Sequence, residues 1–304
     1  MKLLIGILLA ALAIWSGSAA ASILIGIIYS LTLDLSDDFI TKSIGPRLLQ
    51  IGIVILGLSI SLTKAFSLSG TYLPYISLLA LITFFLGIYI GKLIGLDKKL
   101  TLLIASGAAI CGGTAMVAIA PIIKARPKDL LTAITIIFLL NALAIITFPF
   151  IGTYLGMSQD QFGAWAAMSI HDTSSVIGAA MVFGQESVET AATLKLGRTL
   201  WLIPLVIYLA FVYQDKNKLK PKIPIFVFLF ILAIIIGSTL DFDAQNISYL
   251  KLSSQSFLLA GLFCIGTQIN KKSLSNLSTK PLQLALMLWA LVIPVSYIIV
   301  QTII

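Results

Sequence analysis

The chain has 304 residues, of which 59% are hydrophobic and only 11% are charged, and its net charge is +8. Soluble domains carry about 25% charged residues, so this composition excludes a soluble protein and predicts a polytopic membrane protein. The basic residues lie in short loops between apolar runs, as in the positive-inside pattern, and no basic domain is present that would bind nucleic acid. One histidine and two cysteines in apolar segments exclude a multi-histidine metal site and a disulfide framework, and we expect no cofactor.

Apolar segments follow one another along the whole chain, with short linkers and nothing that resembles a soluble domain. They lie at about 3–14, 19–31, 46–63, 72–95, 101–123, 129–155, 162–184, 188–213, 223–240, 254–269 and 281–303. The first resembles a signal peptide, but we favour a short membrane helix because everything after it is also membrane-embedded. We expect a single transmembrane domain over 1–304, with scaffold segments at about 19–95 and 223–303 and core segments at about 101–213.

The charges of the loops orient these segments. Basic residues stand on both sides of segment 101–123, namely Lys92, Lys98 and Lys99 before it and Lys124, Arg126 and Lys128 after it. This pattern predicts that the segment enters and leaves the membrane at the cytoplasmic side. Segment 162–184 has acidic neighbours instead, and the lysines of 216–222 place that loop inside. The solution is an all-α protein of the cell membrane with about nine spanning helices and two broken re-entrant hairpins, 101–123 and 162–184.

Short matches between the two halves of the chain indicate inverted internal repeats. The sequence Thr-Leu-Asp occurs at 32–34 and again at 239–241, and Ser-Leu-Ser occurs at 67–69 and again at 273–275. The two pairs are separated by nearly the same number of residues, and the predicted orientations of the matched segments are opposite. Inverted repeats with interrupted helices near the midplane of the membrane are the architecture of many secondary transporters.

The first broken segment contains Gly112-Gly113 at its centre, followed by Thr114. Each glycine costs about 1 kcal/mol in a helix relative to alanine, so we expect a break here, near the middle of the bilayer. The helix that restarts at Gly113 would present free N–H groups and partial positive charge to an anion. The alternative is that these small residues only allow close packing of helices.

The second broken segment contains five consecutive polar residues, His171, Asp172, Thr173, Ser174 and Ser175. Ionisable residues within a membrane segment are candidates for function. We assign His171 and Asp172 to a coupling ion, and Thr173, Ser174 and Ser175 to an oxyanion. The alternative is a hydrogen-bonded helix cap without a ligand.

Two cations lie in the next segment, at Lys195 and Arg198. They are three residues apart and therefore share one helix face. If the helix begins near Val188, the rise of an α-helix places Arg198 about 15 Å deep in the membrane. Both cations then require a polar cavity, Asp172 or an anionic solute as their partner. We add them and Asn141 to the substrate-binding candidates. A structural ion pair or snorkelling to the interface is the alternative.

The motifs of these segments carry a family resemblance. Ala109-Ile-Cys-Gly-Gly-Thr-Ala with the Ala-Pro-Ile-Ile-Lys-Ala that ends at Ala125, Phe162-Gly-Ala-Trp through Ile170-His-Asp-Thr-Ser-Ser-Val, and Lys195-Leu-Gly-Arg-Thr-Leu-Trp resemble the YeiH-like family, provisionally called sulfate exporters. The family is grouped with the cation:proton antiporters and bile-acid symporters. The resemblance implies a scaffold and a mobile core that work by alternating access.

The favoured function is an ion-coupled secondary transporter of a small anion, such as sulfate, sulfite, or a small organosulfonate or carboxylate. The alternative is a cation:proton antiporter with Asp172 as its carrier. An intramembrane enzyme built on His171, Asp172 and Ser174 is disfavoured, because neighbouring residues of one chain segment cannot form a catalytic triad by themselves. The expected partners are the anion, a coupling proton or sodium ion, the lipid bilayer and, as one assembly to consider, a second copy in a homodimer.

Overall fold

A computed structural model describes residues 2–33, 35, 39–213, 225–240, 242–268 and 279–303. Over these ranges every regular element is a helix and no strand occurs, so the all-α prediction is confirmed. The basic loop 216–222 and the repeat match at 273–275 lie outside the described residues, as do Asp34 and Asp241 of the other match. The helices, in chain order, are α1 (Lys2–Trp15), α2 (Ala19–Leu33), α3 (Thr41–Gly57), α4 (Leu62–Leu93), α5 (Lys98–Ala109), α6 (Gly113–Ile119), α7 (Pro127–Tyr154), α8 (Gln159–Ser169), α9 (Thr173–Phe183), α10 (Gln185–Thr199), α11 (Leu202–Val212), α12 (Ile225–Thr239), α13 (Ala244–Gly266) and α15 (Thr279–Ile303).

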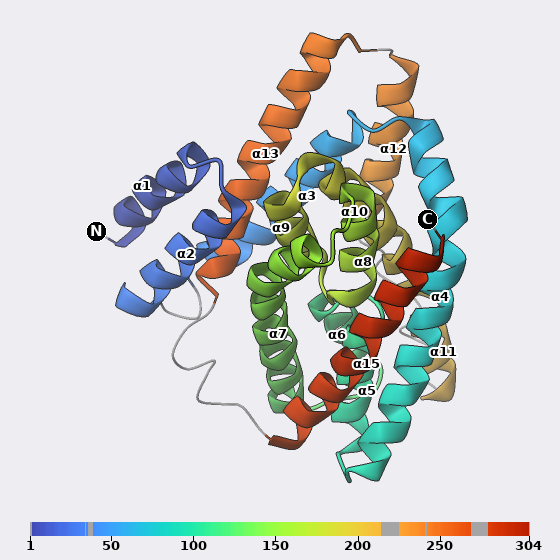
Figure 1. Cartoon of the computed structure of the whole chain (residues 1–304). Coiled ribbons are helices and arrows are strands. Elements are labelled where there is room, and N and C mark those ends of the chain that lie inside the picture. The colour runs from blue at the N-terminus through green and yellow to red at the C-terminus, as the bar shows by residue number, and fades with distance from the viewer. Residues whose placement is uncertain are drawn as a thin grey trace.

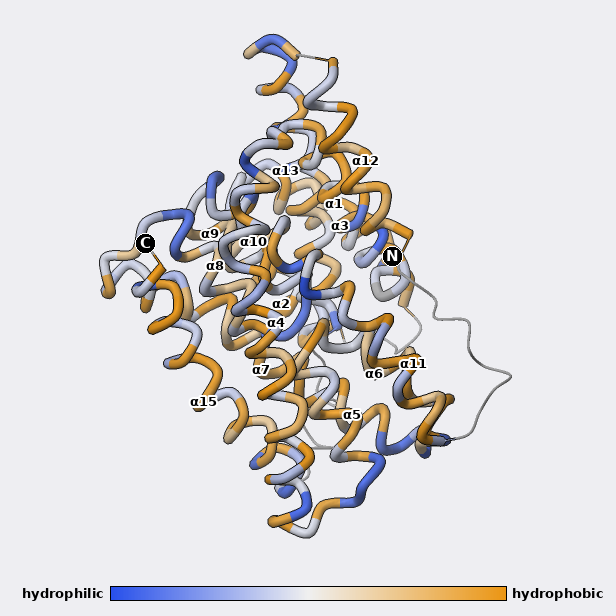
Figure 2. Tube along the Cα trace, turned by 90° about the vertical axis from the view of Figure 1, so that its right-hand side faces the viewer, coloured by the Kyte–Doolittle hydropathy of each residue, from blue (hydrophilic) through white to orange (hydrophobic). Residues whose placement is uncertain are grey.

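The helices have the dimensions and surface of a membrane protein. Among the described residues, four helical stretches are long and apolar enough to cross a membrane: 62–93, 127–154, 185–212 and 279–303. Shorter apolar helices accompany them. Large apolar side chains such as Phe150 and Phe211 are exposed on their outer faces. Figure 2 shows hydrophobic residues along the helices and hydrophilic residues mostly towards their ends.

One group of helices consists of α1, α2, α3, α12 and α13, in which α13 packs against α3, α2 and α1 (Figure 1). Helices α2 and α13 cross at a pair of glycines. A Cβ atom on Gly26 would overlap the carbonyl oxygen of Phe263, and one on Gly266 would overlap that of Ile23. Only glycine permits this close backbone approach, which is a common way to join helices in a membrane.

The other group surrounds the two broken segments. Helix α4 packs against α5, α10 and α15, while α15 also contacts α8 and α7. Indole N–H groups tie α15 to α8 in both directions, since Trp165 Nε1 donates to Ile293 O at 3.1 Å and Trp289 Nε1 donates to Ser169 O at 3.1 Å. Phe148 of α7 stacks against both indoles. The two groups of helices meet where α9 contacts α2 and α13, where α10 contacts α3, and where α12 contacts α4.

Candidate functional site

The segment 98–123 is a helix that breaks and turns back. Helix α5 begins at Asp97, whose side chain accepts from the backbone N–H groups of Lys99 and Leu100, and it ends at Ala109. Gly112 has φ +61°, a conformation that glycine adopts readily, and α6 starts directly after it. The two ends of the segment lie together, because Lys99 Nζ donates to Lys124 O at 2.7 Å. The turn at 110–112 is therefore the tip of a hairpin, which we call the first tip.

The segment 159–183 has the same form. Helix α8 begins with a capping box between Ser158 and Gln161. It ends at Ser169, and α9 begins after Asp172. Gln159 at the start of α8 reaches residues that follow α9, since its Oε1 accepts from Glu186 N at 2.9 Å and its carbonyl accepts from Ser187 Oγ at 2.6 Å. The turn at 170–172 is the second tip.

The two tips touch each other. A Cβ atom on Gly112 would lie 3.0 Å from Asp172 Cβ and 3.4 Å from Asp172 Cα. Both residues are buried. The contact joins residues that are far apart in the sequence and brings the glycine break of the first tip against the polar run of the second.

Asp172 lies at the centre of a hydrogen-bond network at the second tip. Its Oδ1 accepts from Ser175 N at 2.8 Å, which caps the start of α9. Its Oδ2 accepts from Ser175 Oγ at 2.8 Å and from the amide nitrogen of Asn141, which comes from α7. The amide oxygen of Asn141 faces His171, at 3.2 Å from the backbone nitrogen and 3.1 Å from Nδ1. Because this oxygen only accepts, the ring nitrogen that faces it is the N–H of the imidazole.

Both cations of α10 bind backbone carbonyls at the tips. Lys195 Nζ donates to Ile170 O at 2.7 Å. The guanidinium of Arg198 lies between the helix ends that lead into the two tips and donates to four carbonyls. These are Ala109 O (2.8 Å) and Ala108 O (2.7 Å) at the end of α5, and Met168 O (2.6 Å) and Ala167 O (3.1 Å) at the end of α8. The last carbonyls of a helix have no partner within it and carry partial negative charge, so Arg198 and Lys195 cap the ends of α5 and α8.

The family model described as Conserved hypothetical protein 698 matches residues 2–285. The chain belongs to this family. Its relatives carry the name UPF0324, and the family predicted from the motifs is consistent with it.

Curated relatives cover most of the chain. A UPF0324 membrane protein of Bacteroides thetaiotaomicron is 34% identical over 91% of this chain and 85% of its own length. One of Photobacterium profundum is 40% identical, over 80% of this chain and 74% of its own length. One of Vibrio vulnificus is 34% identical, over 94% of this chain and 93% of its own. No solved structure matches the chain. With these relatives and its apolar helices, this UPF0324 protein is membrane-embedded.

Most of the residues predicted for the site gather in one cluster in this UPF0324 protein. We call it the tip cluster, and it comprises the buried residues Gly112, Asn141, His171, Asp172, Ser175, Lys195 and Arg198. Gly113, Thr173 and Ser174 are half-buried beside it, and Thr114 is exposed on α6. For the polar run, the sequence left open a hydrogen-bonded helix cap without a ligand. Asp172 is the N-cap of α9 and accepts from Ser175 N, so a cap is present, but Asp172 also contacts Asn141 of α7.

The structure gives Arg198 a partner that the sequence did not indicate. Its candidate role was a direct grip on an oxyanion, whereas four of its five N–H groups have a carbonyl acceptor here. The acceptors belong to alanine and methionine backbone, which carries no side-chain signal. An indirect signal was available in the sequence. Two broken helices leave the carbonyl groups of their last turns without hydrogen-bond donors, and a cation of a neighbouring helix can supply them.

A second charged group was also missed, and we call it the lysine–glutamate cluster. Glu189 of α10 is nearly buried and pairs with Lys251 of α13 at 2.7 Å and with Lys64 of α4 at 3.3 Å. Lys64 also lies 3.8 Å from Asp160 of α8, which accepts from Thr190 Oγ1. These pairs connect α4 and α13 to α8 and α10. In the sequence, Asp160 and Glu189 are two of the acidic neighbours of segment 162–184, and that position alone did not indicate their lysine partners.

Proposed function

We propose that this UPF0324 protein is an ion-coupled secondary transporter that moves a small anion by alternating access, and that it is not an enzyme. The observation that carries the proposal is the tip cluster, in which two interrupted helices meet around buried charges. Interrupted helices that present their ends to a common point are how many transporters hold ions at the midplane of the membrane. In the proposal, both hairpins are re-entrant and belong to inverted repeats, within a protein of about nine spanning helices.

The balance of charge favours an anion as the solute. By formal charge, Lys195 and Arg198 bring two positive charges to the tip cluster and Asp172 brings one negative charge, and all three residues are buried. Each half-helix adds about half a charge at its end, positive at the starts of α6 and α9 and negative at the ends of α5 and α8, so these contributions cancel to first order. The formal charges of the cluster therefore leave an excess of one positive charge in a place where unpaired charge is costly, and a bound anion would neutralise it.

The side chains then divide the work. Arg198 and Lys195 hold the carbonyl ends of the tips and set the positive field, so that the solute meets their charge more than their N–H groups. Ser174, Thr173 and Thr114, at the rim of the cluster, supply hydroxyl groups for an oxyanion. Asp172, with His171 beside it, binds the coupling ion. Binding of a proton or sodium ion there adds one positive charge to the cluster, and this added charge raises the affinity for the anion.

Transport into proteoliposomes tests the proposal. Purified protein is reconstituted, and uptake of labelled sulfate, sulfite, methanesulfonate and acetate is measured with and without a proton or a sodium gradient. We expect saturable uptake of at least one anion that one of the gradients accelerates, and none in protein-free liposomes. Absence of uptake for all these anions, together with proton-coupled exchange of sodium or potassium, would contradict the proposal.

A cation:proton antiporter is the second candidate, because Asp172 is the one carboxylate in the tip cluster. Asp172→Asn separates the two functions. If the solute is an anion, the variant exchanges anions but no longer responds to the gradient, since it keeps the oxygen that caps α9 but has lost the titrating charge. If the protein is an antiporter, the same variant loses all transport. Asn141→Asp provides a control that adds a carboxylate at the contact without removing Asp172.

The re-entrant arrangement has a test of its own. Cysteines introduced at Lys98 and Lys128 are expected to react with an impermeant maleimide from the same side of the membrane, and a cysteine at Gln185 from the opposite side. Both native cysteines are buried and should react slowly. Labelling of positions 98 and 128 from opposite sides would mean that the chain crosses the membrane between them, and the hairpin would then be excluded.

A further inference from the structure

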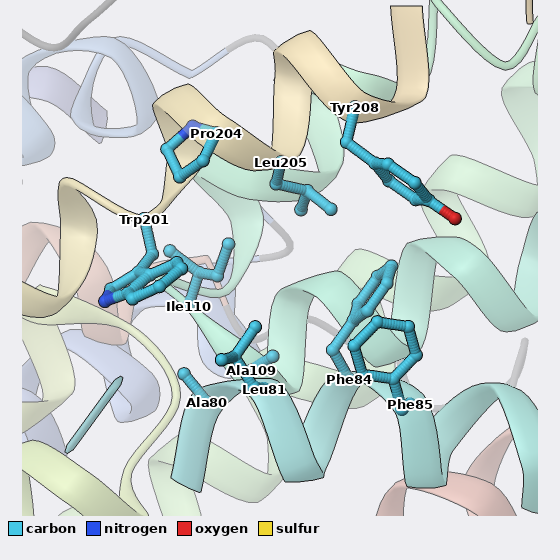
Figure 3. A pocket seen from close by; sticks show the side chains of 10 residues that line it. All are labelled: Ala80, Leu81, Phe84, Phe85, Ala109, Ile110, Trp201, Pro204, Leu205 and Tyr208. Atoms are coloured by element: carbon cyan, nitrogen blue, oxygen red, sulfur yellow. The ribbon is translucent and has the colours of Figure 1, made fainter. Parts of the chain in front are cut away.

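An apolar pocket lies beside the first tip, between α4 and α11 (Figure 3). Its volume is about 240 Å³. Ala80 and Phe84 of α4 form one wall, Leu205 and Tyr208 of α11 form the other, and Ala109 and Ile110 of the tip form its floor. Figure 3 shows Trp201 at one end and the aromatic rings of Phe84, Phe85 and Tyr208 at the other. Of the side chains that line it, only those of Trp201 and Tyr208 have a polar atom.

The pocket is held in shape by the same residues that organise the tip cluster. Its floor is fixed because Ala109 O accepts from Arg198 Nε at 2.8 Å. Its end wall is fixed because Trp201 Nε1 donates to Ser77 Oγ of α4 at 2.9 Å. Trp201 follows Arg198 by one helical turn, so a single stretch of chain places the guanidinium behind the floor and the indole at the end. The pocket and the positive cluster thus share the peptide groups of the first tip.

We propose that this pocket holds the apolar body of the transported anion, so that the solute is a small organic anion with a ring or branched alkyl group, such as an arenesulfonate or an arenecarboxylate, and not bare sulfate. The inference rests on the proposed function and adds the class of solute to it. An apolar cavity of about 150 Å³ accommodates benzene in an engineered protein, so the volume here is sufficient for one substituted ring.

Charge complementarity selects this occupant over a lipid acyl chain. The inner wall and floor, Ala80, Ala109 and Ile110, are buried. A ring seated there touches Ala109 and lies one peptide group from the guanidinium of Arg198. A negatively charged substituent at that end of the ring gains the field of the uncompensated positive charge, whereas a hydrocarbon chain gains only contact area. Leu81, Phe85 and Tyr208 also line the pocket and are 40%, 57% and 51% exposed, so the pocket opens there at the outer surface of α4 and α11.

The test measures binding of tritiated benzenesulfonate to the full chain in lipid nanodiscs, and transport of benzenesulfonate and sulfate in proteoliposomes. Ala80→Phe fills the pocket from α4. Leu78→Phe is the matched control, because it enlarges an exposed side chain of the same helix outside the pocket. We expect saturable binding to the parent that sulfate displaces, unchanged binding to Leu78→Phe, and at least tenfold weaker binding to Ala80→Phe at equal thermal stability.

The outcomes distinguish this inference from the proposed function. Transport of sulfate without saturable binding of benzenesulfonate overturns the inference and leaves an anion transporter. The inference is also overturned if Ala80→Phe binds benzenesulfonate as tightly as the parent, because the ligand then does not occupy the pocket. It is overturned as well if neutral toluene displaces tritiated benzenesulfonate as effectively as unlabelled benzenesulfonate does, because the protein then does not recognise the negative charge. If a lipid acyl chain occupies the pocket instead, benzenesulfonate should show no saturable binding in a nanodisc, because lipid is present there in large excess. If benzenesulfonate and sulfate are not transported, and neither are sulfite, methanesulfonate and acetate, the proposed function itself fails.

Discussion

Removal of the Arg198 guanidinium should destabilise the protein strongly, because this group satisfies both tips at once. Arg198→Met keeps most of the side-chain length and removes all the donors. Four buried carbonyls then lose their partner. At about 1 kcal/mol for each buried acceptor left without a donor, the free energy of unfolding falls by about 4 kcal/mol. Arg198→Lys keeps the charge, but one ammonium group cannot span two tips, so we expect it to lose about half as much.

Thermal unfolding in detergent, followed by intrinsic fluorescence, measures this effect. A loss of 4 kcal/mol corresponds to a fall in melting temperature of roughly 10 °C for a chain of this size. Arg126→Met is the control, since the Arg126 side chain is 69% exposed and pairs with Asp129 in the same helical turn. Because this one pair is lost, its melting temperature should fall by roughly 3 °C at most, well short of the fall expected for Arg198→Met. If Arg198→Met also melts at the temperature of the parent, the contacts between the guanidinium and the carbonyls contribute nothing, and a role in solute binding alone becomes the better interpretation.

Two further predictions concern the contact between the tips and the lysine–glutamate cluster. Gly112→Ala places a Cβ atom at a residue with φ +61°, only 3.0 Å from Asp172 Cβ of the opposite tip. It should lower the free energy of unfolding by about 2 kcal/mol and abolish transport. The Cβ atom of Gly113→Ala would meet the ring of Phe138 at 3.4 Å, so this variant should behave like the parent. Equal transport by the two variants would refute the contact. Glu189→Gln removes the ion pairs to both lysines, whose side chains are about one-third exposed, so chemical denaturation should show a loss of about 1 to 2 kcal/mol, and no loss would mean that these pairs are fully screened.

The sequence predicted the helical class and the two interrupted segments because both depend on local composition. Gly112-Gly113 and the polar run from His171 to Ser175 are unfavourable in a continuous membrane helix, whatever surrounds them. In the structure the helices break at 110–112 and at 170–172, which include Gly112 and the first two residues of the polar run. The number of spans, the orientation and the inverted repeats stay predictions, since they depend on a membrane and on residues outside the described ranges.

The partners within the site were harder to predict because they depend on the depth and direction of packed helices. Asn141 was among the predicted substrate-binding residues, and the structure places its side chain between His171 and Asp172. The carbonyl partners of Arg198 and Lys195 are backbone atoms of apolar residues, which no side-chain pattern marks. The cluster around Glu189 joins helices that are distant in the sequence, and the pocket at Trp201 consists of apolar residues that look like ordinary membrane-facing helix.

The architecture of the tips connects the structural need for cations with the proposed transport of an anion. A helix that stops inside the protein leaves carbonyls that no water can satisfy, and two such ends meet here. Arg198 and Lys195 satisfy them, but they bring two full charges to ends that carry only about half a charge each. Asp172 removes part of this excess, and the remainder makes the empty cluster costly to move through a bilayer. In the proposed transport cycle, a bound anion lowers that cost, so the charges that stabilise the broken helices would also favour movement of the core when the solute is present.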